Sequence, residues 1–213
     1  MIHENAFLDA ALFIAILIPS VILHEVAHGF VANRLGDPTA RDAGRLTLNP
    51  AKHIDPFGSI LLPALLALAR QNVFGWAKPV PVNPGRFQHP VGGMAITALA
   101  GPATNLLIAF AVGRLGPFIE VDGRVFRTTD GLMTDVLIGV LVVNAALAVF
   151  NMLPIPPLDG SRLLPLVLGQ RGREVYNRIS QYGFLILILL LFVFEDSLSF
   201  VGTAIQWIIR LVI

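Results

Sequence analysis

His24, Glu25 and His28 form an H-E-x-x-H pattern inside an otherwise apolar stretch of the chain. On a helix, positions i and i+4 lie one turn apart on the same face, so both imidazoles can reach one ion. Glu25 is rotated by roughly a third of a turn, close enough to accept a proton from a water activated by the ion without being a ligand. The spacing therefore predicts a hydrolytic zinc site. The alternative, two interfacial histidines and a capping glutamate, would leave a charged residue in an apolar helix without a task.

Asp159 is the predicted third ligand, because zinc bound by two histidines needs one more protein ligand and an open position for water. The chain has no cysteine, and its other three histidines lie in polar flanks. Asp159 follows a proline-rich break directly after an apolar block, where a helix cannot continue. Unwound backbone at membrane depth is tolerated only where it faces protein or a water-filled cavity. The alternative is an ordinary Asp-Gly turn at a helix end.

Two asparagines are candidates for contacts with a substrate. A tetrahedral oxyanion needs a hydrogen-bond donor besides the metal. Asn151 lies at the same break as Asp159, and Asn105 lies in an apolar helix interrupted by Gly and Pro. Either amide could stabilise the oxyanion or hold the substrate strand. The alternative for both is an interhelical hydrogen bond, worth about 0.6 kcal/mol on average in membranes. Asn144, in the same block as Asn151, is expected to serve only in packing.

The composition indicates a membrane protein. Of 213 residues, 55% are hydrophobic and 14% are charged, against about 25% charged in an ordinary soluble domain. Apolar blocks cover residues 7–30, 91–115, 132–153, 184–194 and 200–213. These observations exclude a soluble enzyme and a disordered chain, and predict an all-α polytopic membrane protein with about five to six transmembrane helices. The net charge of +1 provides no basic field for nucleic acid, so the expected surroundings are the lipid bilayer.

The apolar run over residues 57–69 is too short for a full crossing, and Pro63 interrupts it. A run of this length favours a re-entrant or interfacial segment. If residues 57–75 enter and leave on the same side, twelve of the fifteen Lys and Arg residues share one membrane face. If every apolar block crosses the membrane, the Lys and Arg residues divide evenly between the two membrane faces. The positive-inside rule therefore predicts a re-entrant second element and an N-terminus outside the cell.

Residues 73–84 show strand-like alternation, with Pro79 and Pro81 blocking one edge only. A helical substrate must be unwound and held extended before it can be cleaved, most simply by pairing with a strand edge. We therefore expect a short membrane-associated strand or loop here that presents substrate to the metal. The alternative is an interfacial connector anchored by Trp76.

The chain is expected to form a single membrane-embedded domain over residues 1–213. No internal repeat or low-complexity tract divides it, and the longest polar interval is about twenty residues, too short for a soluble module. Within the domain, residues 7–165 would form the catalytic core. Residues 180–213 would form a C-terminal helical hairpin.

The paired motifs resemble the site-2 protease family of intramembrane zinc metalloproteases. The resemblance rests on H-E-x-x-H in one helix and on N-x-x-P-x-x-x-x-D-G, from Asn151 to Gly160, after a later one. Residues 44–56, 75–83 and 100–105 match the short bacterial and archaeal branch, which lacks PDZ and CBS modules; the match covers most of residues 20–165. Ser161 departs from that branch, which often has Gly there, with little expected consequence.

The resemblance implies His24, His28 and Asp159 as the ligands of one Zn²⁺ ion and Glu25 as the general base. It also implies a multi-pass protein of the cell membrane that cleaves transmembrane segments of protein or peptide substrates, as in regulated intramembrane proteolysis. Two other functions are the alternatives. A cation-binding transporter would leave the H-E-x-x-H helix unexplained. A catalytically silent membrane scaffold would have no need of Glu25.

Overall fold

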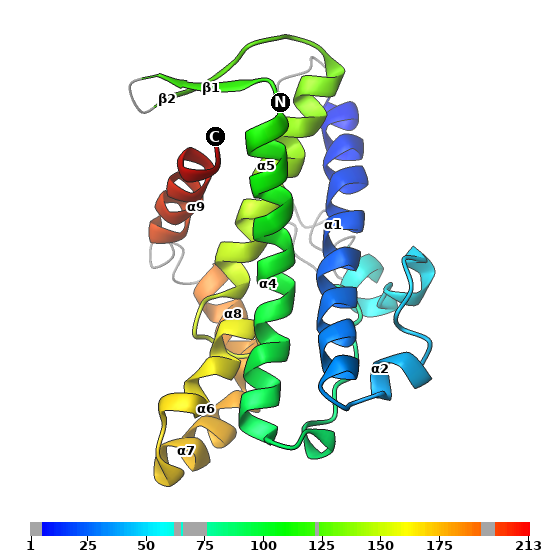
Figure 1. Ribbon diagram of the computed structural model, residues 1–213, viewed down its shortest axis with the longest axis vertical. Helices are drawn as coiled ribbons and strands as arrows, with labels where there is room; N and C mark the ends of the chain where they lie inside the picture. The colour runs from blue at the N-terminus through cyan, green and yellow to red at the C-terminus, as the bar shows by residue number, and fades with distance from the viewer. Residues whose placement is uncertain (1–5, 62–64, 66–75, 122–123, 193–198) are drawn as a thin grey trace.

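Three long helices form the body of the protein in the computed structural model, which describes residues 6–61, 65, 76–121, 124–192 and 199–213. They are α1 (Ala6–Arg34), α4 (Pro90–Leu115) and α5 (Leu132–Asn151), and α4 packs against both others (Figure 1). By length and apolar composition, each of the three can cross a membrane. The described chain is thus mostly helical and contains three helices apolar enough to cross a membrane, as the apolar blocks predict.

Proline lies inside two of these helices, at Pro19 in α1 and Pro102 in α4, yet both helices continue past it. Each proline removes one backbone donor to the carbonyl four residues earlier. Neighbouring helices and Ser or Thr side chains commonly compensate for such losses in membranes. Because α1 is uninterrupted, His24 and His28 stay on one helical face.

The connection from α1 to α4 is built from short turns of helix and an extended segment. It contains α2 (Thr39–Asp42), η1 (Pro50–Lys52), η2 (Pro56–Leu61) and η3 (Pro84–Arg86). Residues 76–83 are extended but belong to no sheet, so the described part of the predicted strand or loop is a loop. Of the predicted re-entrant segment 57–75, only residues 57–61 and 65 are described; the rest lies outside the described residues.

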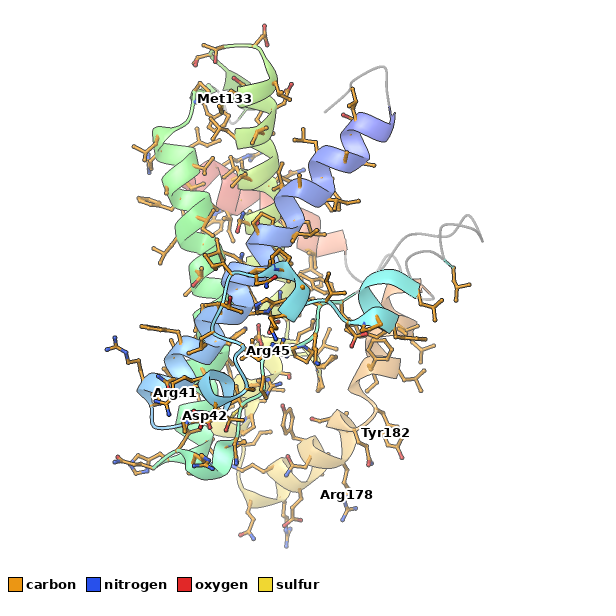
Figure 2. The ribbon with its side chains drawn as sticks, turned by 90° about the vertical axis from the view of Figure 1, so that its right-hand side faces the viewer. Arg41, Asp42, Arg45, Met133, Arg178 and Tyr182 are labelled. Carbon is orange, nitrogen blue, oxygen red and sulfur yellow. The ribbon has the colours of Figure 1, made fainter. Side chains whose placement is uncertain are left out.

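A small antiparallel β-hairpin, which was not predicted from the sequence, connects α4 to α5. Its strands are β1 (Phe118–Val121) and β2 (Arg124–Arg127), with Phe118 opposite Arg127. The hairpin lies at one end of the helical body (Figure 1), and Met133, at the start of α5, lies at the same end (Figure 2).

The chain beyond α5 begins at the opposite end of the body. It forms η4 (Asp159–Leu163), α6 (Leu164–Val167), α7 (Gln170–Ser180), α8 (Gly183–Phe192) and α9 (Ser199–Val212). Leu187 of α8 packs with Leu153 and Leu158 after α5, whereas Val212 of α9 packs with Ala109 and Leu141, nearer the hairpin. Val201, near the start of α9, packs against the same cluster as Leu187, so α9 begins beside α8 and continues toward β1 and β2 (Figure 1). The connection of the predicted C-terminal hairpin, residues 193–198, lies outside the described residues.

Candidate metal centre

The two histidines of α1 and one carboxylate from beyond α5 meet inside the helical body. His24 and His28 are 5% and 8% exposed, and their Nε2 atoms lie 3.0 Å apart. The Asp159 Oδ2 atom lies 3.1 Å from His24 Nε2 and 3.2 Å from His28 Nε2. The three residues that the sequence analysis singled out as ligands are therefore in mutual contact, although 135 positions separate His24 from Asp159.

Tight turns after α5 bring Asp159 to this position. The Leu158 N–H donates to the Ile155 carbonyl, and the buried Ser161 hydroxyl donates back to the Leu158 carbonyl at 2.7 Å. A Cβ on Gly160 would lie 2.2 Å from the Met152 carbonyl oxygen. Only glycine therefore allows η4 to pack directly on the backbone at the end of α5, which fixes the neighbouring Asp159.

The Asp159 carboxyl is ionised at neutral pH. Burial by itself would raise its pKa, but hydrogen bonds with His24 and His28 and their electrostatic attraction outweigh burial and lower the pKa to about 2. A carboxylate must be deprotonated to bind a metal, and this environment keeps it so.

The three donor atoms fit a zinc ion. Two imidazole nitrogens and one carboxylate oxygen, all within 4.8 Å of one another, form the donor set of many catalytic zinc sites. Gly101 of α4 faces the cluster: a Cβ there would lie 2.4 Å from His28 Nε2 and 2.5 Å from His24 Nε2. The missing side chain of Gly101 therefore leaves room beside the two imidazoles.

The outer nitrogen of each imidazole is also held. His28 Nδ1 donates to the backbone carbonyl of Thr97 at 2.7 Å, and His24 Nδ1 lies 2.5 Å from the Asn105 Oδ1 atom. Such partners orient a ligating histidine and leave the other ring nitrogen free for the metal. Both partners come from α4, so the α1–α4 contact orients both rings.

Glu25 lies beside the cluster, partly exposed, and makes contact with the extended loop. Its Oε2 atom accepts a hydrogen bond from the Val80 N–H at 2.8 Å.

Two further hydrogen bonds hold the same loop. The buried Arg45 (Figure 2) donates from Nη2 to the Lys78 carbonyl at 2.6 Å, and the Asn83 N–H donates to Asp37 at 2.6 Å. The loop is thus attached to α1 and to the chain that follows α1.

The two asparagine candidates occupy different places. Asn151 ends α5, and its Nδ2 atom donates to the Leu147 carbonyl at 2.9 Å. Asn105 is fully buried on the far side of the His24 ring, and its Nδ2 atom donates to Asn144 Oδ1 at 2.8 Å. Both amide atoms of Asn105 are therefore engaged by protein. Asn144 was expected only to pack; the one available sequence signal was a polar residue within an apolar block.

In sequence, the chain is similar to known zinc metalloproteases. The model of the family described as "Peptidase family M50" matches residues 127–194. "Putative zinc metalloprotease YwhC" of Bacillus subtilis (strain 168) is 38% identical over 82% of this chain and 77% of its own length. "Putative zinc metalloprotease Rip2" of Mycolicibacterium smegmatis is 36% identical over 84% of this chain and 66% of its own length.

One solved structure is also similar, the "Site-2 Protease from Methanocaldococcus jannaschii". It is 20% identical with a TM-score of 0.43, and the likeness covers 98% of this chain and 78% of that one. The family assignment rests on the Bacillus relative, which is similar along most of both chains. Together with the motifs, this similarity shows that the chain belongs to peptidase family M50, the site-2 protease family of zinc metalloproteases.

Proposed function

We propose that this protein is an intramembrane zinc endopeptidase in which His24, His28 and Asp159 hold one zinc ion and Glu25 is the general base. The observation that carries the proposal is the convergence of three metal-binding atoms between helices long enough to span a membrane. A buried charged group among such helices is costly unless it has a partner or a function. The substrates are transmembrane segments of proteins or peptides.

Zinc bound at this site would supply Lewis-acid polarisation of the scissile carbonyl and would acidify a water molecule. The side chains of the protein carry the remaining steps. Glu25 accepts the proton of the attacking water and delivers it to the leaving amine. Because the Val80 N–H holds one carboxylate oxygen of Glu25, the other oxygen is available for the proton. Asn151, at the break after α5, remains the candidate donor for the oxyanion.

The loop over residues 73–84 presents the substrate in this proposal. Its described part bonds to the protein through alternate residues: the N–H groups of Trp76, Lys78 and Val80 donate to Gly58, His53 and Glu25. Since hydrogen-bonding groups alternate along an extended chain, the opposite edge carries Pro79 and Pro81. The edge that the prolines leave unblocked is thus occupied by the protein itself. An extended substrate on the proline edge would be held only by donating its own N–H groups to the carbonyls of the loop.

The remaining topology is part of the same proposal. The N-terminus lies outside, residues 57–75 enter and leave the membrane on one side, and five to six segments cross or enter the bilayer of the cell membrane. Residues 7–165 carry the chemistry as the catalytic core of one domain. The excess of Lys and Arg on one face under this topology supports it.

Replacing Glu25 with Gln tests the function most directly. In reconstituted vesicles, the Glu25→Gln protein should retain zinc and lose cleavage of transmembrane substrates by at least about 100-fold, the upper contribution expected of one acid–base group being about 10,000-fold. Glu174→Gln, at an exposed position of α7, is the matched control and should cleave normally. Membrane proteomics that compares cells carrying the two variants would reveal the substrates as transmembrane segments that stay uncleaved with Glu25→Gln and are cleaved with Glu174→Gln.

The alternative functions predict other results. A cation transporter would retain ion flux in the Glu25→Gln protein, and a silent scaffold would show no difference between the two variants. Full cleavage by the Glu25→Gln protein, or a wild-type protein that binds no zinc, would contradict the proposal. The loop is tested separately: photocrosslinkers at Pro79 and Pro81 should capture a substrate trapped by Glu25→Gln, and crosslinkers at exposed Gln170 should not.

A further inference from the structure

A chain of buried hydrogen bonds runs through all three long helices and ends on His24. In α1, the Ser20 hydroxyl donates to the Ile16 carbonyl at 2.8 Å. In α5, Asn144 Nδ2 donates to Ser20 Oγ at 3.0 Å and to the Val140 carbonyl at 2.9 Å. Asn144 Oδ1 faces the Nδ2 atom of Asn105 in α4, and Asn105 Oδ1 faces His24 Nδ1. Asn105 and Asn144 are both 0% exposed.

The Val140 carbonyl fixes the direction of every bond in this chain. A backbone carbonyl can only accept, so the Asn144 atom beside it must be the amide nitrogen. The Asn144 oxygen then faces Asn105, which must turn its own nitrogen toward it. Asn105 is left with its oxygen toward His24, and an oxygen of this kind requires a donor. His24 therefore carries a proton on Nδ1, and Nε2 is the ring nitrogen that faces Asp159 and His28.

We propose that Asn105 and Asn144 are positioning residues that hold His24 in the Nδ1–H form and so keep its Nε2 ready to bind metal. Where this concerns zinc, it rests on the function proposed above. His28 differs, because its Nδ1 donates to the Thr97 backbone carbonyl, which no side-chain substitution removes. His28 is therefore an internal control, because of the two histidines on α1 only His24 depends on side-chain amides.

Nitrogen NMR of the full-length, zinc-stripped protein with ¹⁵N-labelled histidine tests the tautomer. His24 should show the Nδ1–H form in the wild type and in Asn105→Asp, which keeps an acceptor oxygen, and should lose this preference in Asn105→Leu. His28 should be unchanged in all three proteins. Retention of the His24 form in Asn105→Leu, its loss in Asn105→Asp, or an equal change at His28 would overturn the proposal.

Zinc retention provides the second measurement. The chelator concentration that removes half of the zinc should fall about 10- to 100-fold in Asn105→Leu, the range typical for loss of a partner to a metal-bound histidine. Asn144→Ala, which leaves both His24 and Asn105 in place, should shift the value in the same direction by a smaller factor. Ser20→Ala should have no effect, because the Val140 carbonyl still orients Asn144.

The outcomes of these measurements are independent of proteolysis. Wild-type zinc retention in Asn144→Ala would overturn the role of Asn144, and a loss in Ser20→Ala as large as in Asn105→Leu would show that general packing, not bond direction, is responsible. The NMR result on metal-free protein holds whether or not the enzyme cleaves a substrate. A failed Glu25→Gln test would therefore remove the proposed function and leave the proposed tautomer control standing.

Discussion

The interface between α4 and α5 has two parts with opposite chemistry. Around Asn105 and Asn144 it is polar, and the amides connect to α1 and to the cluster of His24, His28 and Asp159. About one helical turn away, Ala109 and Leu141 lie in an apolar cluster with Phe118 and Val212 of α9. The same pair of helices thus builds the candidate site in one part and holds the C-terminal helix in the other.

The two parts depend on different properties of their side chains. In the polar part each donor is matched to a specific acceptor, so a change of a single atom alters which hydrogen bonds a neighbouring side chain can make. In the apolar part there is no gain from leaving lipid, and helices associate chiefly through close packing. Substitutions in the polar part should therefore change zinc binding and cleavage, whereas substitutions in the apolar part should change stability.

The largest effect should come from Gly101→Ala in the polar part. A methyl group there would lie 2.4–2.5 Å from both Nε2 atoms, far inside van der Waals contact, and would displace the imidazoles. We expect loss of zinc by a factor of at least about 100 and a corresponding loss of cleavage, measured by chelator titration and a vesicle cleavage assay. Gly92→Ala on the same helix, where the nearest atom would be 3.9 Å away, should behave as wild type. Normal zinc binding in Gly101→Ala would contradict the site geometry.

Leu141→Ala, in the apolar part, should lower the stability of the protein without changing its zinc binding. Leu141 is nearly fully buried among Ala109, Phe118 and Val212, so truncation leaves a cavity. The free energy of unfolding in detergent should fall by about 2 kcal/mol. Zinc retention of the folded protein should not change. A parallel loss of zinc would show that the two parts of the interface are not separable; Leu132→Ala, at an exposed position of the same helix, is the control.

Asp37→Asn should give a smaller, pH-dependent effect at the loop that reaches Glu25. Burial would raise the pKa of Asp37, but bonds from the Thr39 hydroxyl, the Asn83 and Thr39 N–H groups and the charge of Arg86 lower it below its ordinary value of 3.8. A carboxyl with a lowered pKa stabilises the fold above that ordinary value and loses this contribution as the pH falls through its folded pKa.

The stability difference between wild type and Asp37→Asn should therefore be about 1 kcal/mol near pH 7 and shrink below about pH 4. Thermal unfolding of both proteins between pH 3 and 7 measures this difference. Asp42→Asn is the matched control, because the Asp42 side chain, at the end of α2 in the same connection between α1 and α4, is 61% exposed beside Arg41. A difference for Asp37→Asn that does not change with pH would contradict the assignment.

The smallest effect should come from Arg114→Met at the apolar end. Arg114 donates to the Leu211 and Ile213 carbonyls and lies over the Phe110 ring, but it is exposed. We expect a loss of about 0.5 kcal/mol in unfolding free energy, read from chemical denaturation, and unchanged cleavage. A loss as large as that of Leu141→Ala would show that α9 is held by polar contacts rather than by packing.

Much of the candidate site follows from local sequence rules. The four-residue spacing of His24 and His28 places them on one face of any helix, and the structure brings Asp159 to them. The role of Gly160 was not predicted, because it depends on the close approach of η4 to the Met152 carbonyl. Asn105 was recognised as a polar residue in an apolar helix, but its partners were not. Asn144 and His24 lie 39 and 81 positions away in the sequence, and only helix packing brings them to Asn105.

The arrangement of short segments was predicted less well, for a related reason. The apolar blocks near the C-terminus predict a helical hairpin, but not that α9 contacts the cluster around Leu187 at Val201 and the cluster around Leu141 at Val212. Hydropathy reports that a segment prefers lipid or a core, and says nothing about which neighbour it meets. The hairpin of β1 and β2 was missed because four-residue strands carry little periodic signal.

The sequence by itself determined that this chain is membrane-embedded and that His24, Glu25 and His28 share one helix, because hydropathy and helical periodicity act over a few turns of backbone. Tertiary structure alone decided that Asp159 reaches the two imidazoles and that Gly101 leaves room beside them. It also decided that the Val140 carbonyl, through two asparagines, directs the proton of His24. These contacts join residues far apart in the chain, and only the packing of α1, α4 and α5 sets the distances between them.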